Sequence, residues 1–221
     1  MLADLAGKRA LVTGAGSGIG RGIAMMLAEQ NASVAVTDLN EEWGAGVAAE
    51  IKGVRTLVLQ LDVSDQASAE RAVQKVMSEW GALDILVNNA GVSSAPDREP
   101  DRDREEDWDV TFAINVKGVV HCCNAVIPHM RERKYGKIVN IASMAGHAPR
   151  RSEGAYAASK AAVLRHTKGL AVSLAPHNIN VNAICPGAVW TRFQEAGALS
   201  RQRRDPTLAR EDPEQIFLDQ Y

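Results

Sequence analysis

The sequence lacks several features that mark common classes of protein. Only three of its 221 residues are cysteines, Cys122, Cys123 and Cys185, and they form neither a C-x-x-C motif nor a Cys/His spacing typical of zinc sites. An odd number of cysteines, two of them adjacent, favours buried free thiols in a reducing compartment over a disulfide framework. We therefore expect no metal site.

Charge and hydropathy give no sign of a charged partner or a membrane. The formal net charge is -2, which provides no electrostatic argument for binding nucleic acid or an anionic membrane surface. We find no apolar run close to the roughly 20 residues of a membrane span. The first residues, with Asp4 among them, do not resemble a secretory signal peptide. These features predict a cytoplasmic protein with neither nucleic-acid nor membrane partners.

Two kinds of segment alternate along the chain. Short apolar, β-branched runs lie at 8–13, 33–38, 55–62, 83–88, 136–143 and 178–185. Longer stretches with helical periodicity lie at 18–30, 41–52, 65–80, 105–133 and 153–174. Strands that alternate with helices predict a single α/β domain over residues 1–221, a doubly wound, Rossmann-like parallel sheet with helices on both faces. A hydrophobic content of 46% is enough to build its core.

A glycine-rich turn, TGAGSGIG (13–20), joins the first predicted strand to the first helix. Glycine lets the backbone turn sharply and approach a ligand closely. The helix N-terminus then offers free N–H groups and a positive dipole end to a pyrophosphate. The turn favours a nucleotide site over a turn that binds nothing, and the residues concerned are Gly14, Ser17, Gly18, Ile19 and Gly20.

The acidic residue at the end of the second strand, Asp38, indicates which dinucleotide binds. A carboxylate there accepts hydrogen bonds from the adenosine ribose hydroxyls and repels a 2′-phosphate. No Arg or Lys precedes Gly18 in the turn, so we predict NAD rather than NADP. An Asp that only caps the strand end is the alternative. The ends of the next two strands add further cofactor candidates: Asp62, Val63, Asn89, Ala90 and Gly91. For Asn88 and Asn89, holding the backbone is the competing role.

One helix carries a tyrosine and a lysine one turn apart, Tyr156 and Lys160. A carbonyl that accepts a hydride also needs a proton, which a phenol can supply. The pKa of a free tyrosine is near 10, and a neighbouring ammonium lowers it. Ser143, at the end of the fifth strand, can hold the substrate oxygen. A solvent-exposed Tyr/Lys pair without a chemical role is the default for this spacing taken alone.

The combination of TGAGSGIG, NNAG (88–91), Ser143, YAASK (156–160) and PG (186–187) resembles the short-chain dehydrogenase/reductase family. The match runs from about residue 8 to 191. The resemblance implies nicotinamide-dependent oxidoreduction with Tyr156 as the catalytic acid/base and Ser143 orienting the substrate. Lys160 would also hold the nicotinamide ribose, and Asn115 would be a fourth catalytic residue that anchors a water. Pro186, Gly187, Val189 and Thr191 would line the nicotinamide site.

The chain departs from the family pattern in its last 30 residues. The family normally continues beyond a lid to a seventh strand, and no such strand is recognisable here. Either the given sequence omits that tail or the protein itself is short. We expect residues from about 190 to 221 to form a substrate lid and its flank. The family's dimer faces correspond to the helices at 105–133 and 153–174, so a homo-oligomer is expected, although the missing strand puts a tetramer in doubt.

For the substrate, position in the chain suggests contacts with residues 93–95 after NNAG, with the loop at 144–154 and with the segment 188–193. Ser94, His147, Arg150 and Trp190 are the candidates there, besides Ser143 and Tyr156. A small secondary alcohol or ketone suits these groups, with a polyol or an acidic compound among the alternatives. Arg150 and Arg151 would recognise an anionic substrate, unless they are simply solvated on their loop. Two competing functions are an NADPH-dependent 3-oxoacyl carrier-protein reductase and a non-catalytic nucleotide-binding protein of the same fold.

Overall fold

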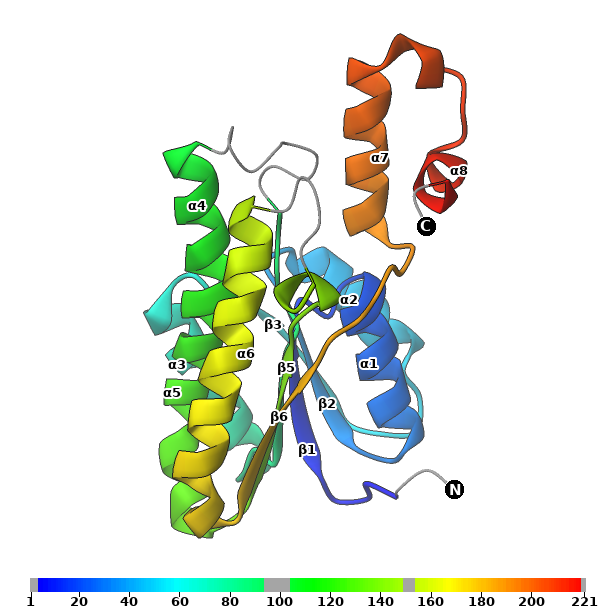
Figure 1. Ribbon diagram of the computed structural model, residues 1–221. Coiled ribbons are helices and arrows are strands. Elements are labelled where there is room, and N and C mark those ends of the chain that lie inside the picture. Colours follow the sequence, from blue (N-terminus) through cyan, green and yellow to red (C-terminus); the bar gives the residue numbers. More distant parts are fainter. Residues whose placement is uncertain (1–3, 94–103, 149–153, 220–221) are drawn as a thin grey trace.

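Six parallel strands form one sheet in the order β3-β2-β1-β4-β5-β6 (Figure 1). The computed structural model describes residues 4–93, 104–148 and 154–219. The strands are β1 (Arg9–Thr13), β2 (Ser33–Asp38), β3 (Thr56–Gln60), β4 (Ile85–Asn88), β5 (Gly136–Ile141) and β6 (Ile179–Ile184). The predicted doubly wound α/β fold is confirmed, and every predicted strand is present.

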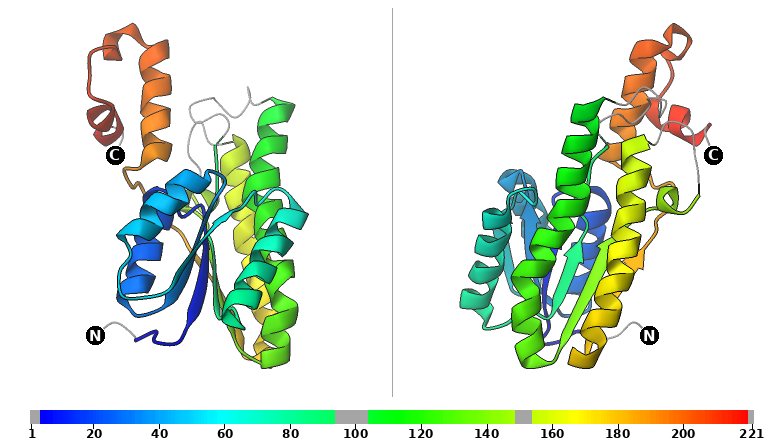
Figure 2. Two further views of the ribbon diagram at one scale, coloured as in Figure 1. Left: turned by 180° about the vertical axis from the view of Figure 1, so that it is seen from behind. Right: turned by 60° about the vertical axis from the view of Figure 1, so that its left-hand side comes forward.

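Helices cover both faces of the sheet (Figures 1 and 2). One face carries α1 (Gly18–Glu29) and α2 (Glu41–Glu50). The other carries α3 (Gln66–Trp80), α4 (Glu105–Phe112), α5 (Gly118–Arg133) and α6 (Gly154–Leu174). Local caps fix several starts: the Asp65 carboxylate accepts hydrogen bonds from the N–H groups of Ala67 and Ser68 at the start of α3.

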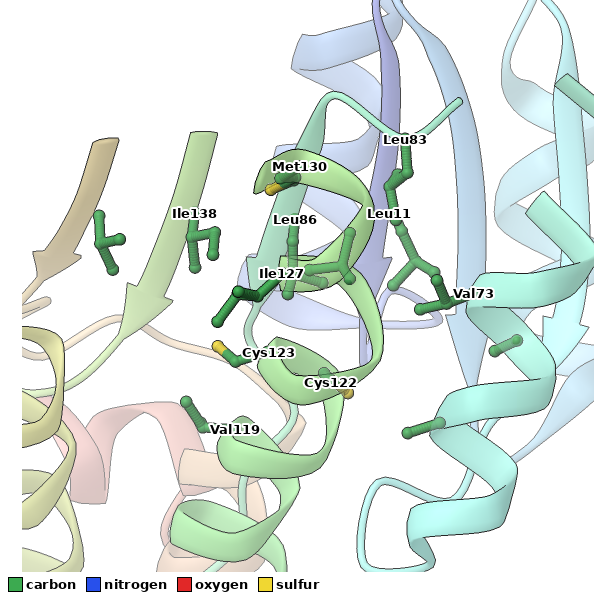
Figure 3. Packing of buried hydrophobic residues seen from close by; sticks show 14 of the residues in the cluster. Leu11, Val73, Leu83, Leu86, Val119, Cys122, Cys123, Ile127, Met130 and Ile138 are labelled. Carbon is green, nitrogen blue, oxygen red and sulfur yellow. The ribbon is translucent and has the colours of Figure 1, made fainter. Parts of the chain in front are cut away.

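The core consists of two layers, because successive side chains of a strand point to opposite faces. On β1, Leu11 faces the α3, α5 and α6 layer, whereas Ala10 and Val12 face α1 and α2. Figure 3 shows the larger layer, in which Leu11, Leu86 and Ile138 of the sheet pack with side chains of α3 and α5.

Two of the three cysteines belong to this larger layer. Cys122 and Cys123, on α5, are buried, and burial raises the pKa of each thiol to about 12. Cys185 follows β6 and is only partly buried. The expectation of buried thiols is therefore correct for two residues and wrong for Cys185, because β6 lies at the edge of the sheet.

The predicted helix at 105–133 is not continuous. A π-helical turn, Ala113–Lys117, separates α4 from α5. π-turns inside helices are rare and commonly mark functional positions. This one carries Asn115, whose side chain is buried with 1% exposure. A periodicity argument over 29 residues does not detect a single widened turn.

The expectation that no apolar run approaches a membrane span is wrong for this helical stretch: Glu105–Arg133 is long and apolar enough by length and composition. A core helix of a soluble protein has the same length and composition. Its inward residues, including Val119, Val126 and Met130, are buried in the larger core layer.

The C-terminal part rises above the carboxyl ends of the strands (Figure 1). It consists of α7 (Arg192–Arg204) and α8 (Pro213–Leu218), which pack against each other. The Gln202 amide donates hydrogen bonds to the main-chain oxygens of Leu208 and Glu211. Within the described ranges no strand follows β6, which forms one edge of the sheet.

Candidate active site

A cleft of about 1320 Å³ opens at the carboxyl ends of the strands. Parallel sheets place ligands there, where the strand order reverses, and β1 and β4 are the strands that meet at this point. Most of the predicted site residues line it: Gly14, Ser17, Gly18, Ile19, Asp38, Asp62, Val63, Asn89, Ala90, Gly91, Ser143, Tyr156, Lys160, Pro186, Gly187, Val189 and Thr191.

The glycine turn leaves the start of α1 open to the cleft. Gly14 and Gly18 have φ values of +61° and +53°, a region that favours glycine. Ser17 is the N-cap residue, but its side chain makes no capping hydrogen bond. First-turn N–H groups without a side-chain cap, beside a cleft, suit an anionic group. The turn therefore fits the pyrophosphate of a dinucleotide.

Gly20 does not line the cleft. A Cβ at this position would lie 2.1 Å from the Gly14 oxygen and 2.4 Å from the Asn89 Nδ2 atom. Its lack of a side chain allows α1 to pack closely against the turn. The motif placed Gly20 in the nucleotide site, whereas the structure gives it a packing role.

Asp38 lies at the rim of the cleft and is held by two main-chain groups. Its Oδ2 atom accepts a hydrogen bond from Gly16 N (2.9 Å), and Oδ1 accepts one from Asn40 N (3.1 Å). Each carboxylate oxygen still has capacity for a further donor. Asp62, one strand further, accepts hydrogen bonds from the N–H and hydroxyl groups of Ser64.

Asn88, the last residue of β4, and Asn89, the residue after it, join strands to each other. The Asn89 amide donates to the main-chain oxygens of Thr13 (2.9 Å) and Gly14 (3.0 Å), and so ties β4 to the turn after β1. Asn88 is buried, and its amide donates to the Asn140 Oδ1 atom on β5 (2.9 Å). Backbone support is therefore a role of Asn89, which also borders the cleft, whereas Asn88 joins β4 to β5 through the side chain of Asn140.

Ser143, Tyr156 and Lys160 all reach the cleft, from the end of β5 and from the first turns of α6. The Lys160 ammonium lies 5.7 Å from the centre of the Tyr156 ring and donates a hydrogen bond to the main-chain oxygen of Ile141 (2.9 Å). Only 4% of Lys160 is exposed, and burial lowers its pKa to about 8. Ser143 Oγ accepts a hydrogen bond from Ala145 N (3.1 Å).

Asn115 lies behind this group rather than on the wall of the cleft. Its Oδ1 atom accepts a hydrogen bond from Val92 N (2.8 Å), and Nδ2 donates to Val92 O (2.9 Å) and to Ser159 Oγ (3.0 Å). The Ser159 hydroxyl in turn donates to the main-chain oxygen of Tyr156. Asn115 therefore links the segment after β4 to the turn of α6 that carries Tyr156.

None of the predicted substrate residues other than Ser143 and Tyr156 is found on the wall of the cleft among the described residues. Ser94, Arg150 and Arg151 lie outside the described residues. His147 is exposed, and it does not border the cleft. Trp190 also does not line it, since its ring packs against Phe217 of α8 with the ring centres 5.3 Å apart.

Some cleft residues have no motif that marks them. Trp43 is one of them. Arg192 and Phe193 also line the cleft, within the segment 188–193 that the sequence assigns to the substrate, and the ring centre of Phe193 is 5.6 Å from that of Tyr156. Asn40 also lines it, and its cap role at the start of α2 is detectable from an Asn before two glutamates. Within the described residues, no group of three metal-ligating side chains is found.

A doubly wound sheet with a glycine turn, an acidic residue at the end of β2 and a Ser/Tyr/Lys group in one cleft defines a dinucleotide-binding oxidoreductase. Comparison with known proteins gives the family: the model for short chain dehydrogenases matches residues 8–201. The chain belongs to the short-chain dehydrogenase/reductase family.

Its relatives differ in the activity for which they are named. The chain is 44% identical to a sorbitol dehydrogenase of Cereibacter sphaeroides, with 84% of this chain and 72% of that protein aligned. It is 38% identical to a 3-oxoacyl-[acyl-carrier-protein] reductase of Thermotoga maritima, over 93% of this chain and 83% of that protein. Among solved structures, NAD+-bound xylitol dehydrogenase matches with a TM-score of 0.84 and 35% identity, covering 89% of this chain and 77% of that one.

Proposed function

We propose that this protein is an NAD(H)-dependent oxidoreductase of a small secondary alcohol or the corresponding ketone, with Tyr156 as the acid/base. One observation carries the proposal: Tyr156, Lys160 and Ser143 share a single cleft with Asp38 and the glycine turn. The side chains suited to proton transfer and those suited to holding the dinucleotide therefore face the same cleft. A protein that only binds nucleotide does not need side chains suited to proton transfer.

The protein side chains handle the proton, while a bound nicotinamide supplies or accepts the hydride. The Tyr156 phenol donates a proton to the carbonyl oxygen in reduction and accepts it from the alcohol in oxidation. The Lys160 ammonium, 5.7 Å from the ring centre, favours the phenolate. Because the Ser143 hydroxyl accepts from Ala145 N, its own hydrogen is available to the substrate oxygen.

Asp38 supports NAD(H) as the cofactor. Two main-chain donors hold its carboxylate at the rim of the cleft, where it would bind ribose hydroxyls and repel a 2′-phosphate. The similarity to NAD+-bound xylitol dehydrogenase also supports NAD(H) as the cofactor. The 38% identity with a 3-oxoacyl-[acyl-carrier-protein] reductase keeps that activity as a second candidate.

The wall of the cleft near Tyr156 supports a small substrate. Val92, Met144, Val189 and Phe193 contribute apolar surface, and Ser143 is the polar group among them. The 44% identity with a sorbitol dehydrogenase supports a polyol in particular.

The first experiment is a fluorescence titration of the protein with NADH and then with NADPH. We expect tighter binding of NADH, and Asp38→Ser should narrow the difference by removing the charge that repels a 2′-phosphate. Equal affinities in the wild-type protein would contradict the role of Asp38. Absence of binding for both would overturn the proposed function.

The second experiment tests the acid/base. Tyr156→Phe should lower turnover of a polyol or simple secondary alcohol by at least about 10²-fold, since proton transfer by a positioned group contributes that much or more. The affinity for NADH should stay close to that of the wild type. A variant that retains turnover would show that another group moves the proton.

We further propose a homo-oligomer that uses the helices at 105–133 and 154–174. Trp108 and Val110 on α4 and Val172 on α6 are exposed apolar residues, with 79% exposure at Val172. Light scattering coupled to size exclusion measures the state directly, and a monomer at micromolar concentration would contradict this assignment.

A further inference from the structure

Arg192 and Trp43 form a contact across the mouth of the cleft. The guanidinium carbon of Arg192, the first residue of α7, lies 4.5 Å from the centre of the Trp43 ring in the first turn of α2. Both side chains border the cleft. A guanidinium at this distance from an indole is attracted to its π face. The start of α7 is thus attached to a helix that comes early in the chain (Figure 1).

The position of Trp43 follows from its neighbours on the cofactor side. Asn40 caps α2 by accepting a hydrogen bond from Trp43 N (3.2 Å). A Cβ added to Gly16 would lie 2.6 Å from the Trp43 Cβ atom and 2.9 Å from the Asp38 Oδ2 atom. Trp43 therefore rests directly on the glycine turn, beside the carboxylate proposed to bind ribose. It stays 44% exposed, although tryptophan is on average a highly buried residue type.

A second contact fixes Arg192. The residue before it, Thr191, packs against Gly18, since a Cβ on that glycine would lie 3.2 Å from the Thr191 Cγ2 atom. Two consecutive residues thus touch the start of α1 and the start of α2. They cross the part of the cleft where the glycine turn offers its N–H groups.

The charge of Arg192 indicates which part of the cleft Thr191 and Arg192 cover. Arg192 forms no ion pair within the described part of the chain. Its cation lies on the same rim as the open start of α1, the place suited to a pyrophosphate. A guanidinium binds phosphate oxygens through several N–H groups at once.

We propose that Arg192 and Trp43 form a clasp that closes over the adenosine diphosphate half of the cofactor, with Arg192 facing its phosphate charge and Trp43 covering the side next to Asp38. The inference rests on the proposed NAD(H) binding. It makes separation of α7 from α2 a condition of cofactor release, so both residues control the dissociation rate.

The test is the dissociation rate of NADH, measured by stopped-flow fluorescence on mixing the complex with excess NAD+. Arg192→Ala and Trp43→Ala should each speed release about 2- to 30-fold, the range for a cation–π contact at a partly exposed site. The double variant should release NADH more slowly than the product of the two single effects predicts, because the residues act as a pair. Arg192→Lys, which keeps the cation, should restore part of the slow release.

Arg203→Ala is the matched control, because Arg203 is an exposed arginine of the same helix that does not border the cleft. It should release NADH at the wild-type rate. Hydrogen exchange without nucleotide gives an independent readout: both Arg192→Ala and Trp43→Ala should speed exchange of the amides of residues 191–195.

The outcomes separate this inference from the proposed function. If the wild-type protein binds NADH and Arg192→Ala releases it at the wild-type rate, the clasp is overturned and the cofactor assignment stands. Strict additivity of the two substitutions would also overturn the clasp. If the wild-type protein binds neither NADH nor NADPH, both the clasp and the proposed function fall.

Discussion

Lys160 is anchored to the end of β5: its Nζ atom donates a hydrogen bond to the main-chain oxygen of Ile141 over 2.9 Å. A Cβ on Gly91 would lie 3.3 Å from the same nitrogen, so the ammonium is enclosed between two strand ends. The enclosure fixes the cation close to Tyr156 but removes it from water. Holding the ammonium there therefore costs folding free energy.

This cost predicts an unusual stability profile for Lys160→Met. The folded-state pKa of Lys160 is about 8, against 10.5 for the free side chain. Below pH 8 the lysine is charged in both the folded and the unfolded state, and its burial costs about 3 kcal/mol. Between pH 8 and 10.5 the folded state loses this proton first, so the wild-type protein gains stability relative to Lys160→Met as pH rises.

Denaturant unfolding of both proteins at pH 7 and pH 10 checks the prediction. The free energy of unfolding of the wild type, relative to the variant, should be higher at pH 10. Turnover of the variant should fall by at least about 10²-fold at either pH. A difference in stability that does not change with pH would show that the lysine is not desolvated.

Gly20→Ala should destabilise the protein, whereas Gly22→Ala in the same helix should not. The new methyl group at position 20 would lie 2.1 Å from a main-chain oxygen, which cannot rotate away, so we expect a loss of about 1–3 kcal/mol and weaker NADH binding. At position 22 nothing lies within 4 Å, and alanine favours the helix by up to about 1 kcal/mol. Thermal unfolding measures both, and equal effects would contradict the packing role of Gly20.

Asp84 should make the protein sensitive to acid. Its buried carboxylate accepts hydrogen bonds from Arg9 Nε (2.7 Å) and Arg133 Nη2 (2.8 Å). Burial alone raises the pKa of Asp84, but the hydrogen bonds from Arg133 and Arg9 outweigh it and leave the pKa below its ordinary value. A lowered pKa contributes stability that is present above the unfolded-state pKa, near 4, and is lost as pH falls through the folded-state value.

Asp84→Asn should accordingly lower the free energy of unfolding at pH 7 by about 3 kcal/mol, the scale for breaking a buried ion pair. The difference from the wild type should shrink below about pH 4. Glu79→Gln, which removes the exposed pair with Lys75, serves as the control and should have little effect. A pH-independent difference for Asp84→Asn would show that the charge of Asp84 is not what matters.

The three thiols should react at two different rates. Burial raises the pKa of Cys122 and Cys123 to about 12, so neither forms thiolate readily at pH 8. Cys185 is partly exposed. An aromatic disulfide reagent should therefore modify one thiol in the native protein and all three after unfolding. Cys185→Ser should remove the fast reaction and Cys122→Ser should leave it, and the opposite pattern would contradict the burial of α5.

The sequence by itself determined the α/β fold, because its signals are local. Strand runs such as 33–38 and 136–143 are apolar and β-branched, and helix periodicity at 65–80 follows a local cap at Asp65. Parallel strands joined by helices then place all strand ends at one edge. The glycine turn, Asp38, Ser143 and the Tyr156/Lys160 pair could therefore be assigned to one cleft from the sequence alone.

Only the tertiary structure decided which contacts join distant segments. The π-helical turn at 113–117 places Asn115 against Val92, and Arg192 reaches Trp43 across the cleft. The local sequence pattern of each segment does not predict which distant residue it contacts. Such contacts depend on how whole helices and strands pack against each other. The same reason explains Trp190: it follows the PG segment in sequence, yet it packs against Phe217 because α8 folds back onto the start of α7.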